Sequence, residues 1–383
     1  MSVTAARGFR AAGVTAGLKA SGAPDVALVI SDGPHFTAAG TFTSNKVVAA
    51  PVRWTRQVLK WQALKAVVLN SGGANACTGA EGFADTHHTA EHVAAGLRLA
   101  PIDVGVCSTG IIGERLDMPT LLAGVDAAIA ALSPDGGHDA ATAIMTTDTV
   151  VKEAVAAHFG VTCGGMAKGA GMIAPGMATM LSVLTTDAVL DPLGAQAALS
   201  RAVDLTFNRI DSDGCMSTND TVLLLANGRS GKTLTDAQTS DLVGTVCAEL
   251  ARAMIADAEG ASKDILIRVG SARSEADAVA VARAVARSNL FKCAMFGEDP
   301  NWGRIVSAVG TADAEFDPEA LGVVINGLPV CRDGAAFGDP TQADLSGREI
   351  EVEIDLDAGD AVGHVWTNDL TTEYVHENSA YST

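Results

Sequence analysis

One segment in the middle of the chain, GGMAKGAGMIAPGMATMLSVLTTDA at residues 164–188, limits the available folds more than any other. From Met180 onward its apolar residues, Met180, Leu181, Val183 and Leu184, are typical of a buried strand. Before that point its glycines and proline predict irregular backbone: Gly164, Gly165, Gly169, Gly171, Pro175 and Gly176. A single threonine, Thr179, stands at the junction. The flanking apolar runs indicate that the segment is buried and is not a flexible linker.

The composition indicates a compact globular protein that handles small molecules. The chain has 383 residues, of which 48% are hydrophobic and 19% charged, so it is too apolar to be disordered. Its length allows one large domain or two to three smaller ones. The formal net charge of −19 leaves no basic surface with which to neutralise phosphates. We therefore expect neither nucleic acid nor membrane as a partner.

The N-terminus and the cysteines predict a cytoplasmic protein with reduced thiols. The N-terminal MSVTAARGFRAAGVTAGLKA lacks the continuous apolar run of a secretory signal. No part of the chain approaches the roughly 18 apolar residues of a membrane span. The seven cysteines are an odd number, are widely spaced and include no C-x-x-C pair. We therefore expect no disulfide framework and no metal site.

Strand-like and helix-like segments alternate along the chain. Short apolar runs predict strands at 25–30, 65–70, 103–109, 221–227 and 264–270. Helical periodicity predicts helices at 81–99, 118–132 and about 235–258. Asp191 before Pro192, and Ser274 before Asp277, are typical of helix N-termini. Residues 349–356 alternate between acidic and apolar, which predicts a strand of antiparallel sheet with one wet face. The predicted fold class is α/β, with layered mixed sheets and helices.

The sequence CSTGIIGE, residues 107–114, places Thr109 and Gly110 at the end of a predicted strand. A hydroxyl and an unhindered backbone N–H can point the same way there, and an oxyanion requires two such converging donors. Taken alone, Ser-Thr-Gly at the end of a strand is more often a simple turn. A catalytic role for Thr109 and Gly110 therefore depends on which residues lie near them.

Thr179 has a second interpretation besides that of a β-branched strand residue. A threonine whose own α-amino group is free carries a base, with a pKa of about 7.7–8.0, beside its hydroxyl nucleophile. Attack of the Thr179 hydroxyl on the carbonyl of Ala178, followed by hydrolysis of the ester, would free that amino group. The glycine- and proline-rich approach and the small Ala178 side chain favour the strained backbone that such an attack needs.

Further distinctive segments extend over essentially the whole chain: GFRAAGVTAGLK, NSGGANACTG, CSTGIIGE, TTDT, DAEGASK, GEDPNWGRI and the terminal NSAYST. Together with KGAGMIAPGMATMLSVLTTDA, in which Thr179 follows GMA, they resemble the ornithine acetyltransferases, the glutamate N-acetyltransferases of arginine biosynthesis. The resemblance implies the layered α/β fold that this family shares with certain self-cleaving aminopeptidases. That fold is analogous to, but topologically distinct from, the fold of the usual N-terminal-nucleophile hydrolases.

The resemblance also implies self-cleavage between Ala178 and Thr179, giving an α chain of residues 1–178 and a β chain of residues 179–383. The two chains would fold together and assemble as a dimer of αβ units. Thr179 would carry the acetyl group from N2-acetyl-L-ornithine to L-glutamate, and Thr109 with Gly110 would form the oxyanion hole. No cofactor is implied, although some members also accept acetyl-CoA as a donor. The implied substrate-binding residues are Thr147 (with Thr146 as the alternative), Lys168, Thr179, Glu259, Asn378 and Thr383.

The charges of the implied site suit zwitterionic amino acids, because Lys168 can pair with a carboxylate and Glu259 with an ammonium. Each of them alone would more often be a surface charge. Two other functions remain open from the sequence: a self-cleaving aminopeptidase of related fold, and a non-catalytic amino-acid sensor that stays uncleaved. An ornithine acetyltransferase of an antibiotic pathway would carry the same motifs.

Overall fold

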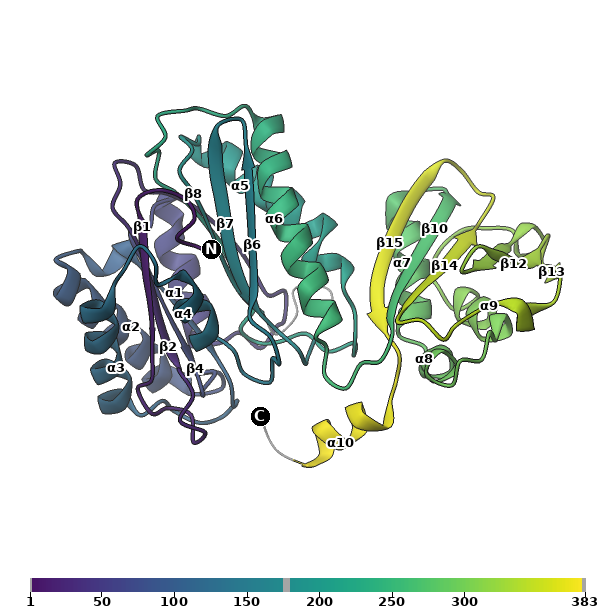
Figure 1. Cartoon of the computed structure of the whole chain (residues 1–383), viewed down its shortest axis with the longest axis horizontal. Helices are drawn as coiled ribbons and strands as arrows, with labels where there is room; N and C mark the ends of the chain where they lie inside the picture. The colour runs from purple at the N-terminus through teal and green to yellow at the C-terminus, as the bar shows by residue number, and fades with distance from the viewer. Residues whose placement is uncertain (1, 175–179, 381–383) are drawn as a thin grey trace.

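The structure is a computed structural model that describes residues 2–174 and 180–380. It consists of a two-sheet body and a smaller C-terminal lobe (Figure 1). Strands and helices are layered as the α/β prediction requires, so the predicted fold class is confirmed. Ala178, Thr179 and Thr383 lie outside the described residues. Among the residues that are described, no helix is long and apolar enough to cross a membrane.

The first sheet of the body has the strand order β1-β2-β4-β5, in which only β4 and β5 are parallel. Its strands are β1 (Phe9–Val14), β2 (Val26–Ser31), β4 (Ala66–Ser71) and β5 (Val104–Thr109). Helices α2 (Gly79–Leu97) and α3 (Met118–Ala131) pack on its outer face (Figure 1). Helix α1 (Ala50–Val58) packs against β5. Helix α4 (Gly137–Ala143) packs against β1 and β2.

The second sheet has the order β3-β9-β8-β7-β6, and here only β8 and β9 are parallel. Its strands are β3 (Thr37–Phe42), β6 (Lys152–His158), β7 (Val161–Lys168), β8 (Leu181–Thr186) and β9 (Thr221–Ala226). Two helices cover its outer face, α5 (Pro192–Leu205) and α6 (Asp236–Ala256). In the sequence, the segment that contains Thr179 therefore lies between β7 and β8, which are neighbours in this sheet.

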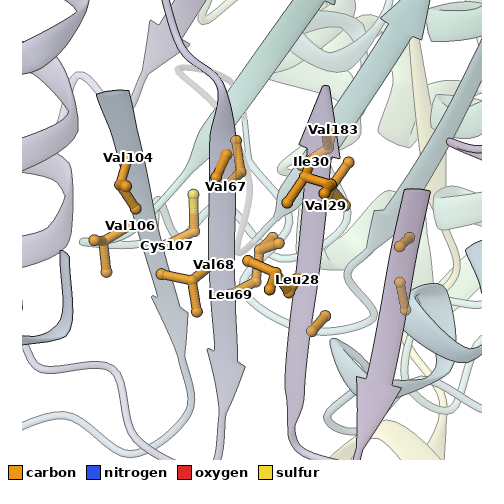
Figure 2. Close-up of a cluster of buried hydrophobic side chains, with 14 of the residues drawn as sticks. Leu28, Val29, Ile30, Val67, Val68, Leu69, Val104, Val106, Cys107 and Val183 are labelled. Atoms are coloured by element: carbon orange, nitrogen blue, oxygen red, sulfur yellow. The ribbon is translucent and has the colours of Figure 1, made fainter. Parts of the chain in front are cut away.

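The two sheets of the body share one apolar core. Met166, Leu181 and Val183 of the second sheet belong to the same buried cluster as the strands of the first. Figure 2 shows Val183 among the side chains of β2, with Val67, Val68 and Val106 on the neighbouring strands. Each fully buried valine or leucine stabilises such a core by about 1.5–3 kcal/mol relative to an exposed one. This core fixes the relative position of the strand ends that carry the candidate site.

The C-terminal lobe contains a six-stranded sheet of order β13-β12-β11-β14-β10-β15. Its strands are β10 (Asp264–Ala272), β11 (Gly322–Ile325), β12 (Leu328–Arg332), β13 (Ala335–Ala336), β14 (Glu349–Asp355) and β15 (Ala361–Asn368). Its helices are α7 (Glu275–Ala286), α8 (Asn289–Phe296) and α9 (Trp302–Val309). After β15 the chain continues into α10 (Thr372–Ala380), which lies beneath the body and the lobe in Figure 1.

The alternation in β14 is confirmed, but the antiparallel prediction is only half right. Ile350, Val352 and Ile354 are buried, whereas the acidic residues between them are exposed or half-buried. The strand is antiparallel to β11 and parallel to β10. Alternation of polar and apolar residues indicates that one face of a sheet is exposed to solvent. It carries no information about the direction of the neighbouring strands.

The other predicted elements agree with the structure to within about two residues at each end. The Asp191 side chain accepts a hydrogen bond from the Gly194 N–H, and the Ser274 side chain accepts one from the Asp277 N–H. The seven cysteines are all free thiols.

The irregular backbone predicted at Gly164 and Gly165 is wrong, because both residues lie inside β7. A side chain at Gly164 would place its Cβ 2.1 Å from the carbonyl oxygen of Ser2. At Gly165 the Cβ would lie 2.9 Å from Val246 of α6. These glycines allow close packing on the two faces of a regular strand, which is a second use of glycine besides the breaking of secondary structure.

Candidate active site

One pocket brings together every predicted site residue that the structure describes. Thr109 and Gly110 come from the end of β5, Lys168 from the end of β7, and Glu259 from the loop after α6. The remaining members are Thr146, Thr147 and Asn378. Thr146 and Thr147 of the TTDT motif both line the pocket, so the structure does not choose between them. The positions predicted for Ala178, Thr179 and Thr383 lie outside the described residues.

Thr109 presents a hydroxyl without a partner at the pocket. The side chain is 2% exposed, and its Oγ1 has no hydrogen-bond partner among the described residues. A buried hydroxyl that forms no hydrogen bond costs about 1–3 kcal/mol, so this hydroxyl is suited to donate a hydrogen bond to a ligand oxygen. Gly110 follows with φ +126°, which turns the chain sharply out of β5.

Gly110 is required by the close approach of two backbone segments. A Cβ on Gly110 would lie 2.6 Å from the Gly73 nitrogen and 2.7 Å from the Gly72 carbonyl carbon. The Gly73 N–H donates a hydrogen bond to the Thr109 carbonyl oxygen at 3.0 Å. The sequences NSGGAN and CSTG, which are separate in the chain, therefore form one wall of the pocket.

We expect Gly110→Ala to destabilise the protein by about 1–3 kcal/mol more than Gly113→Ala, because its Cβ overlaps backbone atoms. Gly113 is the matched control, since its φ of +94° is also positive but no atom lies within 4 Å of its Cβ position. Thermal unfolding of the two variants measures the difference. Equal thermal unfolding midpoints for the two variants would show that residues 72–73 move away from position 110 without loss of stability.

Lys168 is a buried cation at the edge of the pocket. Its side chain is 1% exposed, and burial lowers the pKa of its ammonium from the ordinary value. The negative charges of Asp148, Glu259 and Asp220 oppose that shift in the pKa. The Lys168 Nζ forms no hydrogen bond with the described residues, and the nearest carboxylate oxygen, Oδ2 of Asp148, is 3.8 Å away. Its donors are therefore available to a ligand carboxylate.

Glu259 also lines the pocket and is held there by a backbone contact and by the C-terminal helix. Its N–H donates to the Ala170 carbonyl oxygen at 2.9 Å, and the Asn378 Nδ2 donates to its Oε2 at 3.1 Å. A Cβ on Gly171 would lie 2.5 Å from both carboxylate oxygens, so glycine leaves the space that the carboxylate occupies.

Helix α10 contains the described part of the C-terminal segment YVHENSAY. That helix buries no side chain, and Val375 is 58% exposed. Polar contacts hold it instead, namely the bond of Asn378 to Glu259 and the bond of the Thr371 Oγ1 to the Gly260 carbonyl oxygen at 2.6 Å.

The sequence did not identify Asn219, which lines the pocket, or its neighbour Asp220. The Asn219 Nδ2 donates to the carbonyl oxygens of Ala74 and Ser108, at 2.6 and 2.8 Å, and so ties the pocket wall to the strand before Thr109. The Asp220 Oδ1 accepts the Met180 N–H at 3.0 Å, while its buried Oδ2 has no partner among the described residues. Burial raises the pKa of Asp220 well above its ordinary value. A polar STND sequence before a strand resembles any loop, so no sequence signal distinguished these residues.

The pocket therefore offers a hydroxyl that has no partner among the described residues, a buried cation and a carboxylate to one small ligand. This set can bind a zwitterionic amino acid and stabilise an oxyanion formed on it. The described residues contain no group of histidine, cysteine and carboxylate side chains that could hold a metal ion.

Comparison with known proteins gives consistent matches over the whole chain. The model of the ArgJ family matches residues 10–383. The arginine biosynthesis bifunctional protein ArgJ of Thermobifida fusca is 59% identical over 100% of both chains, and that of Streptomyces coelicolor is 58% identical, also over 100% of both.

Two solved structures are also similar. The ornithine acetyltransferase of Mycobacterium tuberculosis, complexed with ornithine, shares 59% identity with a TM-score of 0.45, over 45% of this chain and 94% of that chain. The arginine biosynthesis bifunctional protein of Bacillus halodurans shares 34% identity with a TM-score of 0.49, over 51% of this chain and 97% of that chain.

Proposed function

The chain belongs to the ArgJ family and is an acyltransferase of arginine biosynthesis, and we propose that it transfers acetyl through an ester on Thr179. The donor is N2-acetyl-L-ornithine and the acceptor is L-glutamate. The observation that carries the proposal is the single pocket in which the orphan Thr109 hydroxyl, the Lys168 ammonium and the Glu259 carboxylate meet.

In the first half-reaction the Thr179 hydroxyl oxygen attacks the acetyl carbonyl carbon of acetylornithine. The α-amino group of Thr179 takes the hydroxyl proton, and the carbonyl oxygen becomes an oxyanion that accepts hydrogen bonds from Thr109 and Gly110. The carbon–nitrogen bond then breaks, and the proton passes from the α-ammonium to the departing ornithine nitrogen. In the second half-reaction the neutral amine of glutamate attacks the acetyl ester, and the same groups return the enzyme to its starting state.

The free amine of Thr179 comes from self-cleavage at the Ala178–Thr179 bond. The Thr179 hydroxyl attacks the Ala178 carbonyl, the peptide nitrogen leaves, and water hydrolyses the resulting ester. Residues 1–178 and 179–383 are the two products. The pairing of β7 with β8, including Lys168 with Leu181, supports products that stay together, because this pairing joins the two pieces in one sheet.

The partners and location follow the family resemblance and remain predictions: a dimer of αβ units in the cytoplasm. We include acetyl-CoA as a second acetyl donor, since the relatives are named bifunctional. Formation of acetylglutamate from acetyl-CoA and glutamate, without acetylornithine, tests this part of the proposal.

We expect Glu259→Gln to weaken binding of ornithine and acetylornithine by about 1–3 kcal/mol, the scale of a charge-assisted hydrogen bond. Glutamine keeps the shape of the side chain but removes the charge that pairs with the substrate ammonium. Acetylornithine has a free δ-amine where acetylglutamate has a carboxylate, so the loss should be smaller for the glutamate pair. Steady-state kinetics in both transfer directions, on fully cleaved protein, measure both losses.

Glu377→Gln is the control for a general change of charge, because Glu377 lies next to Asn378 on α10 but does not line the pocket. It should leave both KM values within about twofold. Equal losses of affinity for the two ligand pairs in Glu259→Gln, or no loss, would show that Glu259 does not bind the ornithine side chain.

A further inference from the structure

Behind the pocket, four charged side chains of alternating sign form a buried row: Lys168, Asp148, Lys152 and Asp257. The Lys152 Nζ lies 2.6 Å from the Asp148 Oδ1 and 2.6 Å from the Asp257 Oδ2. None of the four side chains is more than 8% exposed. Of the four, Lys168 alone lines the pocket.

The two carboxylates of the row also hold the backbone of the pocket. Asp148 accepts the Gly169 N–H at 2.6 Å and the Thr146 N–H at 3.0 Å. Asp257 accepts the Thr149 N–H at 3.0 Å, and two residues later the chain reaches Glu259. The row therefore connects the TTDT loop, the end of β7 and the loop after α6.

The contact between Asp148 and Lys168 differs from the other contacts in the row. The Asp148 Oδ2 is 3.8 Å from the Lys168 Nζ, beyond hydrogen-bond distance, although the pair is fully buried. Asp148 is kept from a closer approach because Lys152 and Gly169 hold its Oδ1 and Thr146 holds its Oδ2. Its charge acts on the Lys168 ammonium, while the three donors of that ammonium form no hydrogen bond with the residues that the structure describes.

Stability alone does not explain this row. Burying an ion pair costs desolvation energy that the attraction often fails to recover, and well-packed apolar residues commonly do as well or better. The two lysines and two aspartates balance in charge, so the row adds no net charge to the interior. Its particular effect is on Lys168, whose pKa is lowered by burial and raised by Asp148.

Given the proposed function, we propose that Asp148 and Lys152 are positioning residues for Lys168. Asp148 keeps the Lys168 ammonium charged for the substrate carboxylate, and Lys152 holds Asp148 too far away to take that carboxylate's place. Asp148 therefore stabilises the charge of Lys168 without binding the hydrogen-bond donors that the substrate carboxylate needs.

The first test is the pH profile of kcat/KM for the cleaved enzyme and its Asp148→Asn variant. Loss of the carboxylate charge lowers the pKa of Lys168, so the ammonium is lost at lower pH. An opposite charge at this distance shifts a pKa by about one to three units, and the alkaline limb should move down by that amount. The acid limb, set by the α-amino group of Thr179, should stay in place.

The charged groups that face Lys168 from the surrounding elements are Asp148, Lys152, Glu259, Asp220 and Lys19. All except Asp148 are the same in the two proteins, so the shift reports the Asp148 charge. An alkaline limb that stays in place in Asp148→Asn would overturn the role of Asp148.

The second test is Lys152→Met, which releases the Asp148 carboxylate to bind Lys168 directly. The KM values for acetylornithine and for glutamate should both rise about tenfold, with kcat within about threefold, because both substrates present a carboxylate to Lys168. Lys152→Arg keeps a cation in the row and should recover most of the affinity. If Lys152→Met does not fold, Lys152→Arg and Asp148→Asn still decide the question, through KM and the pH profile respectively.

Lys263→Met is the matched control, since Lys263 is also a buried lysine in an ion pair, with Glu298 in the C-terminal lobe. It should lower the thermal midpoint without changing either KM. Equal KM changes in Lys152→Met and Lys263→Met would overturn the positioning role and leave only a structural one. Failure of the proposed function would appear separately, as a wild-type enzyme that does not transfer acetyl.

Discussion

Replacing Thr179 with alanine is expected to leave one uncut chain of 383 residues and to lower acetyl transfer by about 10⁴-fold or more. Both effects have the same cause, because the hydroxyl that attacks Ala178 is the hydroxyl that later carries acetyl. Alanine removes it and leaves the α-amine blocked in a peptide bond. Intact-mass analysis reports cleavage, and a labelled-acetyl assay reports transfer.

Thr179→Ser is the control, because serine keeps a hydroxyl and loses only a methyl group. It should still cleave and should retain measurable transfer. If the alanine variant is cut at the same bond, Thr179 is not the agent of cleavage, and the proposed origin of its free amine is wrong.

Replacing Thr109 with alanine is expected to lower kcat by about a hundredfold or more with little change in KM. The hydroxyl is buried and has no partner among the described residues, so it is suited to donate a hydrogen bond to the reacting oxygen, as we propose. An oxyanion donor acts mainly in the transition state, which places its loss in kcat. For the same reason folding should survive, since no hydrogen bond within the described protein is broken. Steady-state kinetics on cleaved protein measure the effect.

Thr55→Ala is a matched control for Thr109→Ala. The Thr55 hydroxyl is also buried, but it forms two hydrogen bonds with the backbone of Val106 in the same strand β5. It should lower stability by about 1–3 kcal/mol while kcat changes far less than in Thr109→Ala. A change confined to KM in Thr109→Ala would make Thr109 a ground-state contact and would require another oxyanion hole.

The fold was predictable wherever a local pattern determines the structure. Apolar runs located β2, β4, β5 and β9, and the caps at Asp191 and Ser274 located the starts of two helices. The pairing of strands was not predictable, as β14 shows with one parallel and one antiparallel neighbour. Gly164 and Gly165 were misread because their contacts, Ser2 and Val246, are distant in sequence.

The pocket was predictable through motif resemblance, and much less so through physical reasoning on single residues. Thr109, Lys168 and Glu259 each resemble ordinary turn or surface residues until the strand ends bring them together. Asp148 and Lys152 could not be found at all, because an i, i+4 pair of opposite charge is typical of a solvated surface. Only the fold shows that both side chains are buried behind Lys168.

The central claim is that acetyl passes through Thr179, and intact-mass analysis of the purified protein incubated with labelled N2-acetyl-L-ornithine tests it most directly. We predict two chains, residues 1–178 and 179–383 apart from any N-terminal trimming, with one labelled acetyl group on the second chain at Thr179. Addition of glutamate should remove the label from the chain and release it as acetylglutamate. An uncut chain, or a cut protein that makes labelled acetylglutamate without ever carrying acetyl on Thr179, would contradict the account.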